Sequence, residues 1–275
     1  MPEGRRMAVI TWTTDFGTSD PYAGDMKGAA LAVNEAIRFV DLTHDVAPGD
    51  VRGAAWILAK SFDRFPVGTC HAAIVDPGVG SERRGLAARA GGYFFVGPDN
   101  GILSAALAAA GDAEVREVSI RHVDAPRRGT TFDGRDVFAP AAARLVTGVP
   151  LHEFGPEVHD AIALPPFEPV RDGDGWSVEI ARVDRFGNLV TVAGESFLRR
   201  EWPDDWRSLE VDAGGRRVSG VRLAYADVAP GAPLLSIGGS GTLEVSVREG
   251  SAAGALGLRA GDRVRIVRPG PQRPG

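Results

Sequence analysis

The sequence predicts an α/β amino-terminal domain with a mostly parallel sheet, followed by a smaller all-β barrel carboxyl-terminal domain. Up to residue 165, apolar and β-branched runs alternate with stretches of helical period, as in a sheet with crossover helices. Residues 166–175 are rich in proline, glycine and charge and have no apolar period, which predicts a linker. From residue 176 to 275, short β-type runs separated by glycine-rich turns predict a small barrel or sandwich.

Composition narrows the class of partner. The 275 residues suffice for two cores, and 44% hydrophobic with 24% charged residues is typical of a soluble globular protein. A net charge of −5 gives no general attraction to nucleic acid or to an anionic membrane. The single cysteine, Cys70, excludes an internal disulfide, and the apolar run after Arg6 is too short for a signal peptide or a membrane span. We expect a cytoplasmic protein whose partners are small molecules or copies of itself.

The first strand is predicted at residues 7–12 and is followed by a polar loop and a helix at 21–36. Pro21 suits the first helical position, so Ser19 or Asp20 is expected to cap the helix. Asp15 lies in the same loop and is not needed as a cap. It is therefore free to hold a ligand at the carboxyl end of the strand.

A second strand at residues 37–42 and a helix at 51–65 follow the same pattern. His44 lies in the loop between them, where a histidine is more often a structural hydrogen-bonding group than a catalyst. No second histidine stands at a metal-ligand spacing from it, so no metal site is predicted.

The third strand, at residues 71–75, ends at the sequence around which the chain is organised, VDPGVGSERR from Val75. Asp76 then lies at the carboxyl end of a buried strand, where open α/β sheets form ligand crevices. Pro77 and two glycines exclude helix and regular strand, so the loop turns sharply and Arg83 can fold back toward Asp76. The alternative for this pair is a surface ion pair across a turn.

The remaining elements of the first domain are a hairpin at 86–90 and 93–96, a short alanine-rich helix, a strand at 114–118 and a helix at 137–146. A polar cluster at 130–136 precedes the last helix. In it Asp136 is a natural cap, whereas Asp133 has no such duty. Strands of the second domain are predicted at 176–183, 209–211, 234–237, 242–247 and 263–267.

Six motifs, in order, resemble the S-adenosylmethionine hydroxide adenosyltransferases, relatives of the fluorinating and chlorinating enzymes. These are TDFGTSDPYAGDMKG from Thr14, DLTHDVAP from Asp41, VDPGVGSERR from Val75, VGPDNG from Val96, TFDGRDVFAP from Thr131 and DRFGNLVT from Asp184. The resemblance implies an α/β domain, a β-barrel, a homotrimer, and sites formed by one subunit's large domain and its neighbour's small one. It implies hydrolysis of S-adenosyl-L-methionine to adenosine and L-methionine without a cofactor.

The resemblance also implies roles for single residues. Asp15 corresponds to the aspartate that binds the ribose hydroxyls, and a carboxylate can accept two hydrogen bonds from a diol. Asp20 and Asp184 correspond to acids that hold the methionine amino group. The remaining implied contacts are Phe132 beside the ribose, Phe186 and Asn188 at the adenine, and Ser240 at the methionine carboxylate.

For catalysis, the hydrolase branch positions its attacking water with an Asp-Arg-His group. Asp76 and Arg83 match the first two members, but Asp133 stands where that branch has histidine. Asp133 either helps Arg83 to orient the water or holds Arg83 too firmly and slows the reaction. The predicted catalytic residues are therefore Asp76 as base, Arg83 and Asp133.

Two other functions stay open. One is a protein that binds S-adenosylmethionine or adenosine with weak or no catalysis. The other, less favoured, is a halide-using synthase, because such relatives lack a carboxylate at the Asp76 position and a negative charge there should repel halide.

Overall fold

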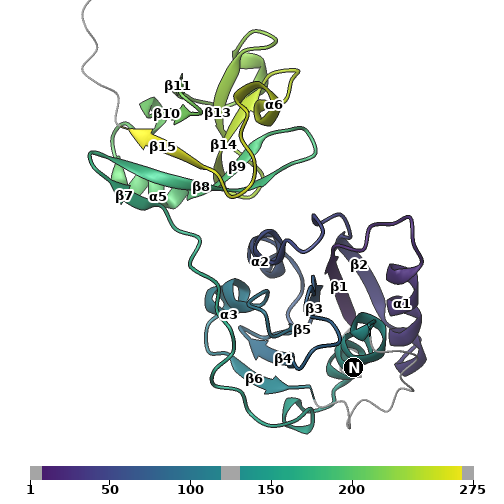
Figure 1. The fold of residues 1–275 in the computed structure, drawn as a ribbon. Coiled ribbons are helices and arrows are strands. Elements are labelled where there is room, and N and C mark those ends of the chain that lie inside the picture. The colour runs from purple at the N-terminus through teal and green to yellow at the C-terminus, as the bar shows by residue number, and fades with distance from the viewer. Residues whose placement is uncertain (1–7, 119–130, 268–275) are drawn as a thin grey trace, which may run out of the picture. The chain divides into compact units, whose positions relative to one another are not determined.

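The computed structural model describes residues 8–118 and 131–267, so the predicted positions of Met7 and Thr130 lie outside the described residues. The chain divides into two compact units, Met1–Pro165 and Pro166–Gly275 (Figure 1). Each unit has its own sheet. No helix among the described residues is both long enough and apolar enough to cross a bilayer.

The first unit is built on a six-stranded sheet in the order β2-β1-β3-β5-β4-β6. The four strands β2, β1, β3 and β5 pair in parallel, whereas β4 is antiparallel to both β5 and β6. The sheet is therefore mixed, because the chain returns through the predicted hairpin instead of a crossover helix. The strand bounds are β1 Val9–Thr14, β2 Arg38–Thr43, β3 Cys70–Ile74, β4 Gly85–Ala90, β5 Tyr93–Pro98 and β6 Glu114–Glu117.

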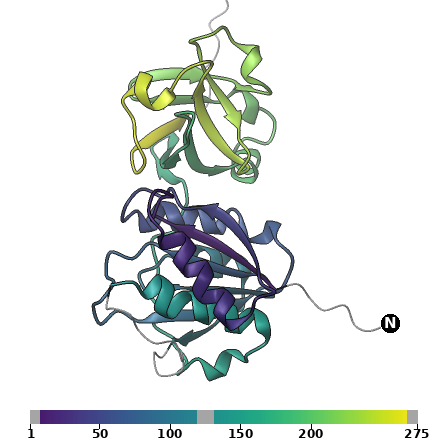
Figure 2. The same cartoon turned by 90° about the vertical axis from the view of Figure 1, so that its right-hand side faces the viewer.

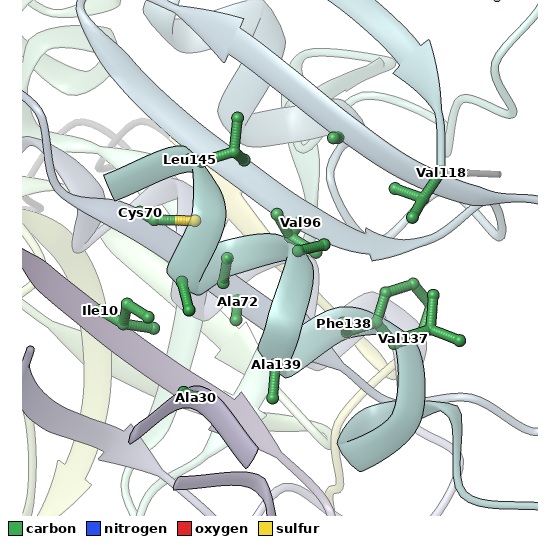
Figure 3. Close-up of a cluster of buried hydrophobic side chains, with 14 of the residues drawn as sticks. Ile10, Ala30, Cys70, Ala72, Val96, Val118, Val137, Phe138, Ala139 and Leu145 are labelled. Atoms are coloured by element: carbon green, nitrogen blue, oxygen red, sulfur yellow. The ribbon is translucent and has the colours of Figure 1, made fainter. Parts of the chain in front are cut away.

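Helices cover both faces of this sheet. Helices α1 (Tyr22–Val33) and α4 (Ala139–Thr147) share one core with the sheet, and α2 (Val51–Ala59) and α3 (Ser104–Ala110) share the other (Figures 1 and 2). Side chains alternate along β3, because successive residues of a strand point to opposite faces. Cys70 and Ala72 (Figure 3) enter the first core together with Ile74, and Ala73 enters the second. The central strand is thus buried on both faces, as its apolar sequence predicts.

Two helices are shorter than predicted, and the expected cap of the first is wrong. Helix α1 has Pro21 at its N-cap position and no side-chain cap, so neither Ser19 nor Asp20 caps it. The helix ends at Val33 because Asn34 is extended and its Oδ1 accepts a hydrogen bond from the Ala36 N–H. Helix α2 ends at Ala59, and only a 3₁₀ turn at Phe62–Arg64 continues it.

The second unit is a nine-stranded sheet in the order β11-β10-β15-β8-β9-β14-β13-β12, with β7 paired to β8. Its pairs are antiparallel except β12 with β13, and β11 also contacts β13, so the sheet curls into a nearly closed barrel. The bounds are β7 Val170–Asp172, β8 Gly175–Val183, β9 Leu189–Gly194, β10 Glu210–Ala213, β11 Arg216–Ser219, β12 Val221–Arg222, β13 Pro233–Ile237, β14 Thr242–Val247 and β15 Arg263–Val267.

The second unit departs from the prediction in three ways. It contains two short helices, α5 (Glu195–Glu201) and α6 (Ala252–Leu256), so it is not all-β. Strand β7 lies inside the predicted linker 166–175, where pairing with β8 orders a stretch that has no apolar period. The prediction also lacked β9, β11 and β12. Of these, β11 and β12 are short: β11 forms a hairpin with the preceding strand β10, and β12 pairs in parallel with β13.

One buried histidine predicts how stability depends on pH. His71 is fully buried in β3, its Nδ1 lies 2.7 Å from Thr11 Oγ1, and burial lowers the pKa of His71 to about 4. Between about pH 6.5 and about pH 4 the unfolded chain binds a proton at His71 and the folded chain does not. We expect the free energy of unfolding to fall as the pH drops from about 6.5 to about 4, measured by denaturant titration.

Two histidine variants isolate the contribution of His71 to this pH dependence. In His71→Asn the free energy of unfolding should change less between about pH 6.5 and about pH 4 than in wild type. In His159→Asn, at a side chain that is 80% exposed, it should change as much as in wild type. An equal pH slope for wild type and His71→Asn would refute the assignment.

Candidate active site

Two loops of the first unit meet at the carboxyl ends of neighbouring parallel strands. Thr14 at the end of β1 pairs with Ile74 at the end of β3, so Asp15 and Asp76 follow at the same edge of the sheet. This edge is where open α/β sheets form their ligand sites. The structure therefore brings together two predicted site residues that are 61 positions apart in the chain.

The loop that carries Asp15 is tied to the loop after β2. Asp15 Oδ2 accepts a hydrogen bond of 2.9 Å from the Gly49 N–H. The Thr14 hydroxyl lies 2.8 Å from His44 Nδ1, and the Val46 N–H donates to the Thr14 carbonyl. His44 is buried, so the prediction of a structural hydrogen-bonding histidine is confirmed. These bonds fix where the Asp15 carboxylate is presented.

Asp76 and Arg83 form a close ion pair across the glycine-rich loop. Arg83 Nε donates to Asp76 Oδ1 at 3.0 Å, and Arg83 Nη2 donates to Asp76 Oδ2, which is bidentate pairing. Gly80 has a φ of 81°, a left-handed conformation that favours glycine and lets the loop turn back. The Asp76 side chain is only 6% exposed, so the alternative of a surface ion pair is wrong.

Asp133 completes this cluster from a distant part of the chain. Arg83 Nη2 also donates to Asp133 Oδ2 at 2.6 Å, and the guanidinium carbon lies 5.2 Å from the centre of the Phe138 ring. Burial opposes the charge on Arg83, but hydrogen bonds and charges from Asp76 and Asp133 outweigh it and raise the pKa of Arg83. Asp133 and Asp76 therefore both hold the Arg83 guanidinium.

A π-helical turn at Gly134–Phe138 positions Asp133 at its start. Such turns are rare and frequently occur at functional sites. The expected cap Asp136 is wrong, because its carboxylate accepts hydrogen bonds from Arg135 at 2.7 and 3.0 Å and Phe138 occupies the N-cap position of α4. The helix therefore begins with a π turn, and not with the Asp136 cap that the sequence pattern predicts.

A cavity of about 330 Å³ connects these groups. Asp15, Asp76, Phe132 and Asp133 line it. So do Phe16 and Tyr22, which sequence reasoning did not assign to the site. The rings of Phe16 and Tyr22 meet the Phe132 ring edge-on, with centroids 5.8 and 5.2 Å away. Their signal in the sequence was their position in the same motif as Asp15. Asp20 is exposed and does not line this cavity.

The second unit carries a separate cavity of about 790 Å³. Asp184, Phe186 and Asn188 line it from the loop between β8 and β9. Asp184 Oδ1 accepts from the backbone N–H groups of Phe186 and Asn188, and its Oδ2 accepts from Asn188 Nδ2 at 2.9 Å. Phe186 is 77% exposed. Ser240 does not line the cavity, and its hydroxyl lies 2.8 Å from Thr242 Oγ1.

Three further residues of this cavity were missed by sequence reasoning. Tyr225 receives a hydrogen bond of 3.3 Å from Asn188 Nδ2, and Ser236 and Glu244 face each other on β13 and β14. No local motif marks them, because Ser236 and Glu244 enter the cavity through strand pairing and Tyr225 lies in a 3₁₀ turn at Tyr225–Asp227. Among the described residues, no group of three or more histidine, cysteine or acidic side chains is arranged to hold a metal ion.

Comparison with known families matches both units. Residues 10–155 match the N-terminal domain of the SAM hydroxide adenosyltransferases, and residues 178–265 match their C-terminal domain. The chain belongs to the SAM hydroxide adenosyltransferase family. Each matched domain contains one of the two cavities, so the sequence resemblance is confirmed over both parts of the candidate site.

Members of the family with named activities cover almost the whole chain. An (R)-S-adenosyl-L-methionine hydrolase of Salinispora tropica is 40% identical over 94% of this chain and 97% of its own length. A protein of the same name from Thermus thermophilus is 38% identical over 95% of this chain and 100% of its own. The crystal structure of an uncharacterized conserved protein from Thermotoga maritima aligns with a TM-score of 0.86 and 33% identity, covering 94% of this chain and 100% of that one.

Proposed function

We propose that this protein hydrolyses S-adenosyl-L-methionine to adenosine and L-methionine by in-line attack of a water on the ribose 5′ carbon. The observation that carries the proposal is the Asp76 carboxylate, held at two atoms by Arg83 in a cavity that Asp15 also lines. The family membership and the names of the relatives support the choice of substrate.

The chemistry requires little beyond orientation. The water oxygen forms a bond to the 5′ carbon while the carbon–sulfur bond breaks, and its electron pair goes to the sulfonium, which leaves as the neutral thioether of methionine. No general acid is needed, so the protein's task is to place the oxygen in line and to accept its proton. Asp76 is the proposed base, and Arg83 holds that base and stabilises a hydroxide-like nucleophile. No cofactor enters this scheme.

Binding roles follow the same proposal. Asp15 accepts hydrogen bonds from the ribose diol beside Phe132, and Asp20 and Asp184 take the methionine amino group. Phe186 and Asn188 bind the adenine, and Ser240 the methionine carboxylate. Asp184 Oδ2 accepts one hydrogen bond from the described residues, from Asn188 Nδ2, which leaves it room for an ammonium. The proposed place of action is the cytoplasm.

We propose a homotrimer in which the second unit of one subunit completes the site of its neighbour. Supporting this, Asp15, Asp76, Phe132 and Asp133 line one cavity and Asp184, Phe186 and Asn188 line the other, so each cavity has only part of the groups that the substrate needs. Light scattering at micromolar concentration should give a trimer. A fully active monomer would contradict the shared site.

Asp133→His should preserve or raise adenosine release. The change restores the Asp-Arg-His group of the hydrolase branch and frees Arg83 from one of its two carboxylates, while its bidentate pair with Asp76 stays intact. We expect a change in rate between none and a several-fold increase, measured by chromatography of adenosine. A loss of about 100-fold or more would show that the second carboxylate is required for the water.

The reaction itself is tested with purified protein and S-adenosylmethionine in ¹⁸O-water, with and without chloride. Hydrolysis should give equimolar adenosine and methionine, with ¹⁸O in the 5′ hydroxyl of the adenosine. Chloride should change neither the products nor the rate. A 5′-chloro product would indicate a halide-using synthase.

A second candidate function is binding without catalysis. It is favoured by the contact between Arg83 and Asp133, because a guanidinium held by two carboxylates is less able to stabilise a hydroxide. Tight binding of S-adenosylmethionine by calorimetry without turnover would select this alternative.

A further inference from the structure

Glu244 on β14 is a buried carboxyl group to which no residue of the described ranges 8–118 and 131–267 donates a side-chain hydrogen bond. Only 7% of the residue is exposed, and it lines the cavity of the second unit. Within the described part of the chain, its side chain makes no hydrogen bond and no ion pair. Burying a carboxylate without a partner is unfavourable, so a group of this kind is expected where a ligand supplies the missing donor.

A second unsatisfied polar group lies directly beside it. Ser236 on β13 is paired with Glu244 across the antiparallel strands, so the two side chains leave the sheet on the same face. Ser236 is 8% exposed and lines the same cavity, and its hydroxyl has no hydrogen-bond partner among the residues that the structure describes. The cavity therefore has two neighbouring polar groups at its floor, one with acceptor oxygens and one that can donate or accept.

The surrounding residues keep the carboxyl group available. An added side chain at Gly238 would overlap the Glu244 carboxyl group, so glycine is what leaves space for it. Asp184, another acid of the lining, already accepts three hydrogen bonds from its own loop. Burial and the charge of Asp184 raise the pKa of Glu244, and Arg182 opposes this only in part.

The walls of the cavity favour a flat heterocycle. Phe186 and Leu223 are 77% and 80% exposed, and the Tyr225 ring lies beside them in the lining. Exposed aromatic and aliphatic faces of this kind suit stacking against a base. Adenine carries one exocyclic amino group, which is the only donor on its ring edge, next to ring nitrogens that accept.

We propose that Glu244 is a specificity-determining residue that accepts a hydrogen bond from the exocyclic amino group of adenine, while the Ser236 hydroxyl donates to an adjacent ring nitrogen. The inference rests on the proposed function, because the adenosyl part of the substrate supplies the base. It adds a residue that discriminates between 6-amino and 6-oxo purines to the adenine contacts proposed for Asn188 and Phe186.

Calorimetry with adenosine and inosine tests the assignment on the intact protein. We expect wild type to bind adenosine at least about 10-fold more tightly than inosine, because a 6-oxo group cannot donate to Glu244. Glu244→Met removes the acceptor and should weaken adenosine about 10- to 100-fold while leaving inosine unchanged. Glu244→Gln keeps an acceptor oxygen and should stay within a few-fold of wild type. Ser246→Ala, at a buried residue of β14 outside the lining, is the control and should change neither affinity.

Thermal unfolding separates recognition from a structural role. Glu244→Met should unfold at the same or a higher temperature than wild type, since it removes a buried charge that has no partner. Destabilisation with an equal loss of both nucleosides would overturn the inference. The inference would also be overturned if Glu244→Met discriminated between adenosine and inosine as wild type does, or if it lost affinity for methionine alone. Failure of the wild-type protein to bind adenosine would overturn it as well. Nucleoside binding can be measured without turnover. If the wild-type protein fails to hydrolyse S-adenosylmethionine but Glu244→Met still weakens adenosine binding selectively, the proposed reaction is refuted and the role of Glu244 is not.

Discussion

Asp76→Ala should reduce adenosine release by about 100-fold or more while S-adenosylmethionine still binds. The variant removes the proposed base and the bidentate partner of Arg83, so the water loses both its proton acceptor and its orientation. The protein should still fold, because Arg83 keeps its hydrogen bond to Asp133 and is not left as an unpaired buried charge. Single-turnover kinetics with calorimetry of substrate binding measures both quantities.

Asp76→Asn distinguishes the base from a simple anchor. An amide oxygen can accept from Arg83 but the amide cannot take a proton at neutral pH. We expect Asp76→Asn to be nearly as slow as Asp76→Ala, whereas recovery of the wild-type rate would reduce Asp76 to a positioning residue. Asp160→Ala is the matched control, because Asp160 pairs with the adjacent Arg84 but its side chain is 81% exposed. Turnover by Asp76→Ala at the wild-type rate would place water activation elsewhere.

Asp15→Ala should weaken the binding of adenosine and S-adenosylmethionine alike, because both contain the ribose diol. Loss of a charge-assisted hydrogen bond typically costs about 1.5 to 3 kcal/mol, which is roughly 10- to 150-fold in affinity. Methionine lacks the diol, so its affinity should not change. Competition calorimetry with the three ligands gives the pattern.

The effect of Asp15→Ala on the loop itself should be small. Asp15 also accepts from the Gly49 N–H, but that contact is exposed and water can replace the carboxylate. Asp45→Ala serves as control, since Asp45 is an exposed acid in the adjacent loop outside the cavity lining. Unchanged adenosine affinity in Asp15→Ala would refute the ribose assignment. Asp15→Ala and Asp76→Ala should affect different kinetic quantities, because Asp15→Ala acts on substrate binding and Asp76→Ala acts on the chemical step.

Local pattern was enough to predict much of the first unit. Residues 71–75 are apolar on both faces of a strand and end at a turn of proline and glycine, so the position of Asp76 at a strand end follows from the sequence. Arg83 is seven residues away in a loop that must turn back, which makes their contact a local event. Motif order predicted the family in the same way, and comparison confirms it.

Tertiary structure decided which of these groups share a cavity. Asp133 reaches Arg83 over a separation of 50 residues, and a π turn that no sequence pattern indicates sets its position. The Asp184 carboxylate accepts hydrogen bonds from its own loop, whereas Glu244, which looks like an ordinary polar residue of a strand, is buried with no side-chain hydrogen bond to any described residue.

The physical reason is the range of the interactions. Propensity, turn chemistry and strand periodicity act over a few residues, so the chain determines the elements and the loops that join them. The burial and partners of a side chain depend on which strands pair and in which register, and β13 and β14 bring Ser236 opposite Glu244 only once that pairing has formed.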